Sequence, residues 1–365
     1  MGESDERSDP LDEAARLFGH ALEEWADGRP AQALQTCLDA LAITERTLGP
    51  SLDTIGILNT LSGIRLDLSD YQGAFDASQR ASAMVSMLVV DDDDTPVHAQ
   101  VRIHTIATLA RVERTLGRLE AAEQHYLEAL TAAEVQAGAD DASLAPMLND
   151  LAVVYKYAAR YDEAVTLYRR ALAAIETSLG PEHADAATVW HNLGGIEHSR
   201  GRHAEGESYA RRSVQIREAA LGPEHPAVAA DIAALAALVQ EQGRLDEADT
   251  LYRRALAVFE SAYGPDHYDV AVACNNLGAL EAARGCHAEA KAHYRRALQI
   301  KETLLGSDHP DVAMTLHNLA VLHAGQGHTQ EACSLFVRAL AIFEAHLGAD
   351  HPKTRVSRDE LAHLT

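Results

Sequence analysis

Histidine is the residue whose spacing first suggests chemistry in this sequence. His183, His225, His267, His309 and His351 recur every 42 residues, and each stands three residues after a glycine. Imidazoles bind metals, but a zinc site needs all its ligands about 2 Å from one centre. Copies that belong to successive helical repeats lie roughly 10 Å or more apart, judged from helix diameters. The spacing therefore favours a structural role in a loop over a metal site.

Two further patterns could do chemistry. His191 and His198 lie seven residues apart, which is about 10 Å along one helix. We therefore expect them to form hydrogen bonds rather than to share an ion or act as a catalytic pair. The run Asp91–Asp94 lacks the spaced ligands and central glycine of an EF-hand loop. It favours a solvated loop over a calcium site.

Nucleophilic and cofactor chemistry have little support in the sequence. It contains no phosphate-binding loop, nucleophile elbow, dinucleotide fingerprint or zinc-protease motif, so we expect no cofactor. Cys37, Cys274, Cys286 and Cys333 are widely separated, which is typical of reduced thiols. Cys286 is followed by His287, but we expect both in a turn without the pocket or positive field that activates a thiolate.

Charge and hydropathy limit the class of partner. The 365 residues include 31 basic and 55 acidic side chains, for a net charge of −24. This balance argues against nucleic acid, which needs clustered Lys and Arg, and against anionic membrane surfaces. No apolar run approaches the roughly 18 residues that span a bilayer. The acidic start, Met1–Glu6, does not resemble a secretory signal, so we expect a cytoplasmic protein.

The elements that would position these residues come from an internal repeat. A Leu-Gly pair recurs at 179–180, 221–222, 305–306 and 347–348, with Tyr-Gly at 263–264. Within each 42-residue unit, apolar residues recur at helical spacing on both sides of a second glycine, such as Gly201 or Gly243. Glycine tolerates the left-handed backbone that ends a helix. Each unit therefore predicts two helices, and such pairs must stack to bury their apolar sides.

These residues resemble a known family. Trp190, Leu193-Gly194, Ala204-Glu205 and the Tyr168/Ala171 pair resemble the tetratricopeptide repeat (TPR), and the 42-residue period is similar to the kinesin-light-chain type. The resemblance implies an all-α, right-handed superhelical solenoid of helix-turn-helix units. We expect a flexible acidic N-terminus over 1–10, about eight repeats over 11–352 and a capping helix over 353–365. Repeat spacing is irregular before residue 103, with an acidic loop at 91–96.

The resemblance also implies where a ligand binds, because first helices line the concave groove of TPR arrays. Carried over position by position, the family's groove predicts twelve ligand-binding residues. They are His104, Arg111, Arg114, Asn149, Val153, Lys156, Tyr157, His191, His198, Gln240, Asn275 and His317.

Charge on the predicted groove suggests the chemistry of the ligand. Only Asp67 and Glu241 bring carboxylates to groove positions, against the cations Arg111, Arg114 and Lys156. We expect these cations to bind the acidic part of a peptide. Asparagine amides both donate and accept, so Asn149 and Asn275, with His191, would pair with its backbone. Kinesin-light-chain members bind peptides with acidic and aromatic residues, but His191 and His317 depart from the family's asparagines.

Two further positions concern the groove surface. Small residues such as Gly63, Ala237 and Ala279 would let a ligand backbone approach closely. Trp25, with Phe18, either anchors a peptide at the groove mouth or packs against the neighbouring repeat.

The sequence thus predicts a protein- or peptide-binding scaffold whose partner segment carries acidic and apolar residues. Two alternatives stay open. One is an enzyme or small-molecule-binding protein with a concave pocket built from His104, Tyr157, His191 and His198. The other is a self-assembling homo-oligomer whose contacts use the apolar end of the groove or the terminal helices.

Overall fold

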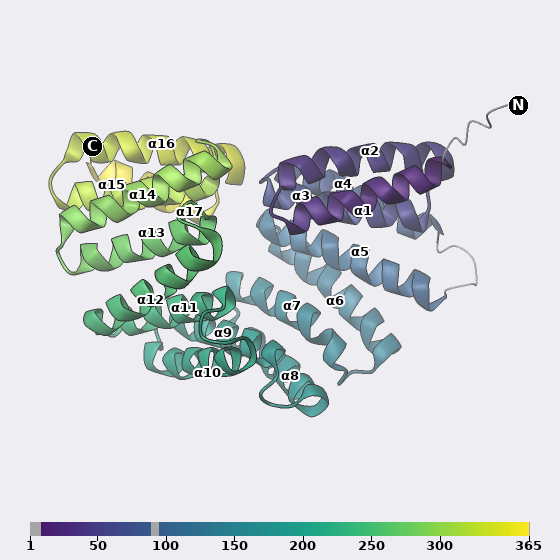
Figure 1. The fold of residues 1–365 in the computed structure, drawn as a ribbon, viewed down its shortest axis with the longest axis horizontal. Helices are drawn as coiled ribbons and strands as arrows, with labels where there is room; N and C mark the ends of the chain where they lie inside the picture. The colour runs from purple at the N-terminus through teal and green to yellow at the C-terminus, as the bar shows by residue number, and fades with distance from the viewer. Residues whose placement is uncertain (1–8, 89–94, 365) are drawn as a thin grey trace, which may run out of the picture. The chain divides into compact units, whose positions relative to one another are not determined.

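Helices make up all the regular structure that the computed structural model describes, namely residues 9–88 and 95–364 (Figure 1). The chain divides into two compact units, residues 1–167 (unit 1) and 168–365 (unit 2), with the boundary inside helix α8. Most of the expected acidic N-terminus and the aspartates 91–94 lie outside the described residues. The all-α prediction is confirmed.

Unit 1 is built from helices that follow one another closely along the chain. They are α1 (Pro10–Ala26), α2 (Pro30–Leu48), α3 (Leu52–Asp67), α4 (Tyr71–Leu88), α5 (Pro96–Thr115), α6 (Leu119–Ala137), the short 3-10 helix η1 (Ala142–Leu144), α7 (Ala145–Tyr157) and the start of α8 (Tyr161–Leu179). Thr95 caps α5 through its hydroxyl, which accepts from the backbone N–H of His98. The expected loop over 91–96 therefore ends one residue early, because Pro96 begins the helix.

Unit 2 continues the same pattern with more regular lengths. Its helices are α9 (Ala184–Ser199), α10 (His203–Leu221), α11 (Pro226–Glu241), α12 (Leu245–Tyr263), α13 (Tyr268–Ala283), α14 (His287–Leu305), α15 (Pro310–Gly325), α16 (Thr329–Leu347) and α17 (Pro352–Leu364). We call the odd-numbered helices from α1 to α15 first helices and the even-numbered ones second helices.

Helices pack in sequence order within each unit. A first helix makes its largest contact with the second helix that follows it, as α1 does with α2 and α15 with α16. Each second helix then packs on the next first helix, and neighbouring first helices such as α3 and α5 or α11 and α13 also touch. This is the stacking that amphipathic helix pairs need in order to bury their apolar sides.

The recurrent histidines begin the first helices of unit 2 and the final helix α17. Their Nδ1 atoms accept a hydrogen bond from the backbone N–H two residues later, at 3.0 to 3.3 Å, in His183, His225, His267, His309 and His351. Such a side chain satisfies one of the free N–H groups at a helix start. The structural interpretation of these histidines is confirmed.

Left-handed residues separate the two helices of a pair. Gly243, between α11 and α12, has a φ of 78°, a conformation that costs glycine little. Ser69 and Ala159 adopt the same left-handed conformation, with a φ of 58° each. The predicted glycine turn is therefore confirmed, although it does not strictly require glycine.

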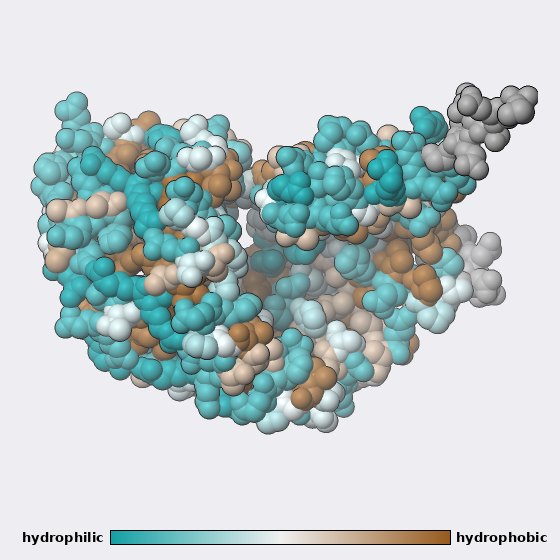
Figure 2. All heavy atoms as spheres, viewed as in Figure 1, coloured by the Kyte–Doolittle hydropathy of each residue, from teal (hydrophilic) through white to brown (hydrophobic). Residues whose placement is uncertain are grey.

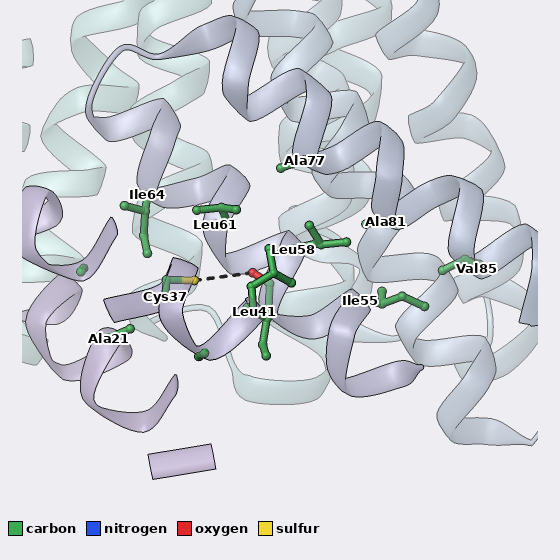
Figure 3. Packing of buried hydrophobic residues seen from close by; sticks show 13 residues of the cluster. Ala21, Cys37, Leu41, Ile55, Leu58, Leu61, Ile64, Ala77, Ala81 and Val85 are labelled. Atoms are coloured by element: carbon green, nitrogen blue, oxygen red, sulfur yellow. Dashed lines mark hydrogen bonds between the residues drawn. The ribbon is translucent and has the colours of Figure 1, made fainter. Parts of the chain in front are cut away.

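Small and aliphatic residues form the core of each unit. In unit 1, Ala21, Leu58 and Ala81 belong to one buried cluster that joins α1 to α4 (Figure 3). The Cys37 thiol lies in it and donates to the carbonyl oxygen of Ile57 at 3.8 Å. Burial raises the pKa of Cys37 to about 12, so the thiol is held in its unreactive form. Across residues 9–88 and 95–364, no helix combines the length and apolar character needed to cross a membrane.

Candidate functional site

The twelve predicted ligand-binding residues all lie on first helices. Those in unit 1 are His104, Arg111 and Arg114 on α5 and Asn149, Val153, Lys156 and Tyr157 on α7; those in unit 2 are His191 and His198 on α9, Gln240 on α11, Asn275 on α13 and His317 on α15. We call the surface that each set forms the first-helix face of its unit. The two faces differ in chemistry.

Cations dominate the first-helix face of unit 1. The side chains of Arg111, Arg114 and Lys156 are all half-buried. Burial lowers the pKa of Lys156. It also lowers the pKa of His104, and the charge of Arg111 adds to that effect. The charge of Arg111 thus makes a second, smaller contribution to the lowered pKa of His104.

The two arginines keep part of their hydrogen-bonding capacity unused. The Nε atoms of Arg111 and Arg114 are buried, and neither has a hydrogen-bond partner in the described part of the chain. A buried donor without a partner costs roughly 1–3 kcal/mol. These Nε atoms are enclosed by the chain itself, so a ligand could reach the guanidinium groups only through their other nitrogens.

One carboxylate interrupts this cationic face, and the sequence prediction missed it. Asp150 is half-buried and lies near Arg114 and Arg111, whose charges oppose the rise in its pKa that burial causes. It accepts hydrogen bonds from Asn149 Nδ2 and from the buried Tyr126 hydroxyl, each at 3.4 Å. Asp150 is not one of the predicted groove positions, at which only Asp67 and Glu241 carry acids, so the prediction did not include this carboxylate. Three cations still outnumber this one acid.

Val153 and Tyr157 complete the face on α7. Val153 is half-buried, whereas 66% of the Tyr157 side chain surface is exposed. Tyr157 directly follows Lys156, so an aromatic ring and an ammonium group stand at the end of one helix. This combination suits a ligand that carries both acidic and apolar side chains.

In unit 2 the polar residues are largely occupied by one another. The Nδ1 of His191 lies 2.8 Å from Asp231 Oδ1, and Asp231 Oδ2 accepts from Ser213 Oγ and from Arg217 Nε, each at 2.7 Å. Burial favours a higher pKa for Asp231, but the hydrogen bonds from His191, Ser213 and Arg217 hold it below its usual value. This network joins α9, α10 and α11, and it uses Nδ1 but not Nε2 of His191.

Asp231 and Arg217 were not predicted, although the repeat gives a signal for the first. Asp231 occupies the position that holds Val189 and Ala273 in the neighbouring repeats, and it is only 2% exposed. A carboxylate in a buried, otherwise apolar position needs partners. That substitution alone could have indicated a polar network.

The remaining histidines of unit 2 also contact other residues of the chain. His198 packs edge-on against His203, with ring centroids 5.4 Å apart. His317 Nδ1 lies 2.9 Å from the hydroxyl of Ser357 on α17, and its ring packs edge-on against Phe336. Burial lowers the pKa of His317. His317 therefore also contributes to the docking of α17, in addition to any role on the face.

Two asparagines and a glutamine retain free polar groups on the face of unit 2. Asn318 Nδ2 donates to Asn275 Oδ1 at 3.0 Å. Within the described chain, the Nδ2 of Asn275 and the Oδ1 of Asn318 have no partner. They form a donor and an acceptor side by side, which matches the donor and acceptor of a peptide backbone. Gln240 Oε1 is buried and likewise has no partner there.

Gly63 does not provide the close approach that we expected from its size. A Cβ atom built on Gly63 would lie 2.5 Å from Cη2 of Trp25, so the indole ring already fills this place. Trp25 Nε1 donates to Asp67 Oδ2 at 2.6 Å. Of the two interpretations of Trp25, packing against the neighbouring repeat is the correct one.

The geometry gives little support to a nucleophilic enzyme. Ser213 bonds to Asp231 rather than to His191, and its hydroxyl is fully buried and so out of reach of a substrate. The described residues contain no group of three or more His, Cys, Asp or Glu side chains placed to hold a metal ion. Hydrogen bonding is the chemistry that these histidines perform here.

Comparison with known proteins identifies the repeat. The family model for the tetratricopeptide repeat matches residues 102–177, 185–261, 228–285 and 269–345, which together make up more than half of the chain. No curated protein matches the sequence significantly. Two solved structures show the same fold at low identity. RapI in its apo form has a TM-score of 0.58 and 13% identity, over 80% of this chain and 98% of that one. A tetratricopeptide repeat protein from Parabacteroides merdae has a TM-score of 0.53 and 14% identity, over 85% and 98%.

The chain is also similar to a putative kinesin light chain from Podosopora anserina with nearly identical TPR-like repeats. That similarity is 25% in sequence over 56% of this chain and 96% of the other, with a TM-score of 0.45.

Proposed function

Because the chain belongs to the tetratricopeptide repeat family, whose members generally act as protein-interaction scaffolds, we propose that its first-helix faces bind a partner protein. The face of unit 1 takes an acidic segment of that partner. The face of unit 2 takes a peptide backbone with small apolar side chains. Both roles are binding roles, without a chemical step.

The observation that carries this proposal is the state of Arg111 and Arg114. Their buried Nε atoms have no hydrogen-bond partner in the described chain, although Asp150 lies nearby. Charge-assisted hydrogen bonds from guanidinium to carboxylate are about twice as strong as neutral ones. An Asp or Glu side chain of a partner would pair with the other nitrogens of these half-buried guanidinium groups, and Lys156 would add a third positive charge.

The amide groups of unit 2 support the second half of the proposal. Beyond the one bond that the two side chains share, Asn275 Nδ2 can still donate a hydrogen bond and Asn318 Oδ1 can still accept one. A peptide unit in extended conformation offers the matching carbonyl and N–H. The face around them is lined by half-buried small residues such as Ala279 and Ala282, which leave room for a backbone.

A titration with synthetic peptides tests the acidic specificity. The probe is a fluorescein-labelled peptide of alternating aspartate and leucine, and its twin carries lysine in place of aspartate. We expect the aspartate peptide to bind, as fluorescence anisotropy would show, and the lysine peptide not to bind. The double variant Arg111→Glu/Lys156→Glu should weaken binding by at least about tenfold while the helical circular dichroism signal is unchanged.

A matched variant separates the site from the net charge. Arg16 and Arg46 are exposed cations of unit 1 without ion pairs in the described chain, so Arg16→Glu/Arg46→Glu makes the same change in charge away from the face. It should leave the affinity within about twofold. If both double variants weaken binding equally, or if Arg111→Glu/Lys156→Glu binds as the unmodified chain does, the face of unit 1 is not the site.

A further inference from the structure

Arginine–glutamate pairs connect successive second helices on the side of the repeats away from the first-helix face. Arg80 of α4 pairs with Glu45 of α2. The same pair recurs as Arg254–Glu218, Arg296–Glu260 and Arg338–Glu302, at N···O distances of 2.5 to 2.6 Å. In each of these three pairs the arginine also donates to a carbonyl oxygen in the turn that follows the glutamate's helix.

The pairing is broken between α4 and α6. Glu128 stands 48 residues after Arg80, the same offset that separates the equivalent alanines Ala74 and Ala122. Likewise Ser86 stands where Glu45 stands in the preceding repeat. The arginine of the pair is thus replaced by Glu128 and the glutamate by Ser86. Glu128 is exposed and has neither an ion pair nor a hydrogen bond in the described chain.

An open apolar pocket lies at this break. Its volume is about 760 Å³, and its walls come from α5 and α6. Pro96, Ala99 and Ile106 line one side, Leu127 and Val135 the other, with Glu128 among them and Arg102 at the edge. We call it the α5–α6 pocket. Figure 2 shows hydrophobic residues gathered over the N-terminal part of α5.

Exposed apolar side chains occur on every second helix from α2 to α16, and Val135 is the most exposed of them. Val135 is 86% exposed and Leu127 is 43% exposed, and Val97 at the start of α5 is 61% exposed. The position of Leu127 is held by arginine in the next four repeats, at Arg169, Arg211, Arg253 and Arg295. Contiguous exposed apolar residues mark interaction sites more often than they occur by chance.

We propose that the α5–α6 pocket docks an amphipathic helix of a basic partner protein. Aliphatic side chains of that helix fill the pocket, and an arginine or lysine beside them pairs with Glu128. This ion pair differs from those of the other repeats, because Glu128 occupies the position that arginine holds in them. A pair that is partly shielded by apolar walls is worth more than a fully exposed one.

Charge selects the occupant. The chain carries a net charge of −24, so a second copy would meet like-charge repulsion over the whole surface. A cationic helix would instead be attracted both by the overall field and by Glu128. This site is separate from the first-helix face, which is proposed to bind an acidic segment, so either proposal can fail without the other.

The test uses a peptide whose chemistry fits the pocket. Residues 287–305 of the chain form a helix with two arginines and two lysines against two glutamates, and the probe is this peptide, capped at both ends and labelled with fluorescein. Its twin carries Arg295→Glu and Arg296→Glu. We expect saturable binding of the arginine peptide to the full chain and at least about tenfold weaker binding of the twin.

Variants of the chain locate the binding. Leu127→Asp and Val135→Asp alter exposed side chains and should leave the fold intact by circular dichroism, while each weakens binding about tenfold. Glu128→Arg should weaken the binding of the arginine peptide and restore the binding of its glutamate twin. Arg111→Glu/Lys156→Glu, on the first-helix face, should leave the affinity of this probe unchanged.

Three outcomes would overturn the proposal. The first is no saturable binding of the arginine peptide. The second is equal affinity of the two peptides for the unmodified chain and for Glu128→Arg, because then charge does not guide the docking. The third is a concentration-dependent dimer in sedimentation velocity that Val135→Asp disperses, because the occupant is then a second copy of the chain.

Discussion

Units 1 and 2 place similar polar residues on their first helices and use them differently. In unit 1, Arg111 and Arg114 share the single nearby carboxylate of Asp150 and keep buried Nε atoms without partners in the described chain. In unit 2, Asp231 is fully engaged by His191, Ser213 and Arg217. Two regions with one repeat architecture therefore differ in whether their charged groups are left partly unpaired or hold the repeats together.

The starts of the first helices differ in the same way. In unit 1, Ser51 caps α3 and Thr95 caps α5 with hydroxyl groups, which do not titrate. In unit 2, imidazole rings such as those of His225 and His309 cap the helices. Unit 2 thus depends on neutral histidines and on one buried carboxylate, and its stability should respond to changes that leave unit 1 unaffected.

The largest effect should come from removing the buried carboxylate. Asp231→Ala leaves Arg217, whose side chain is 15% exposed, without its ionic partner. Breaking a buried ion pair by deleting one member costs about 3–5 kcal/mol. We expect the free energy of unfolding of unit 2 to fall by this amount in urea titrations. The fluorescence of Trp190 in a Trp25→Phe background would report on unit 2, since these are the two tryptophans of the chain.

Asp308→Ala is the matched control in the same unit. Asp308 is exposed, lies in the turn before α15 and makes no ion pair in the described chain. Its removal should change stability by no more than about 0.5 kcal/mol. If Asp231→Ala is as mild as Asp308→Ala, the network around Asp231 does not stabilise unit 2, and the contrast between the units disappears.

Acidification should produce the next largest effect, and a larger one in unit 2 than in unit 1, where His104 also has a lowered pKa. The cap requires an unprotonated Nδ1, and protonation puts hydrogens on both ring nitrogens. Burial lowers the pKa of His309 and of His351 in the folded chain, whereas the unfolded value is about 6.5. The unfolded chain therefore binds more protons below about pH 6.5, and the stability from these caps is present above that pH and lost as the pH falls.

Urea midpoints at pH 7.5 and 5.5 measure this difference, with Trp25 reporting on unit 1 and Trp190 on unit 2. We expect the loss in unit 2 to exceed that in unit 1 by about 0.5–1 kcal/mol per cap. His309→Asn with His351→Asn keeps a capping side chain that does not titrate. That variant should lose part of the pH dependence; an unchanged dependence would mean that other groups cause it.

The sequence predicts the repeat, its helices and the caps because these depend on local, periodic features. The 42-residue spacing places the helices of the regular repeats after residue 103, and the glycine turn follows from left-handed backbone geometry. The sequence leaves two interpretations of Trp25, because the neighbouring residues in the chain do not determine whether its indole contacts Gly63 or a ligand.

Pairing between repeats is what the sequence does not show. Asp150 and Asp231 interact with residues on other helices, and only the folded chain brings those together. The position of Asp231, which holds apolar residues in the neighbouring repeats, indicates a buried carboxylate. The sequence does not indicate that His191 is its partner, because a histidine on that helix could equally bind a ligand. The broken pair at Glu128 required knowing first that Arg80 bonds to Glu45.

The smallest change in stability should come from removing the half-buried carboxylate of unit 1. Asp150→Asn removes the one carboxylate near Arg111 and Arg114, and burial already raises the pKa of Asp150. The substitution should therefore cost less than about 1 kcal/mol in stability, far less than Asp231→Ala, because it removes a charge that burial disfavours. With both arginines then free for the ligand, the aspartate–leucine peptide should bind about three- to tenfold more tightly in anisotropy titrations. Weaker binding in Asp150→Asn would mean that Asp150 orients the arginines rather than competing with the ligand, and the two units would then use their carboxylates alike.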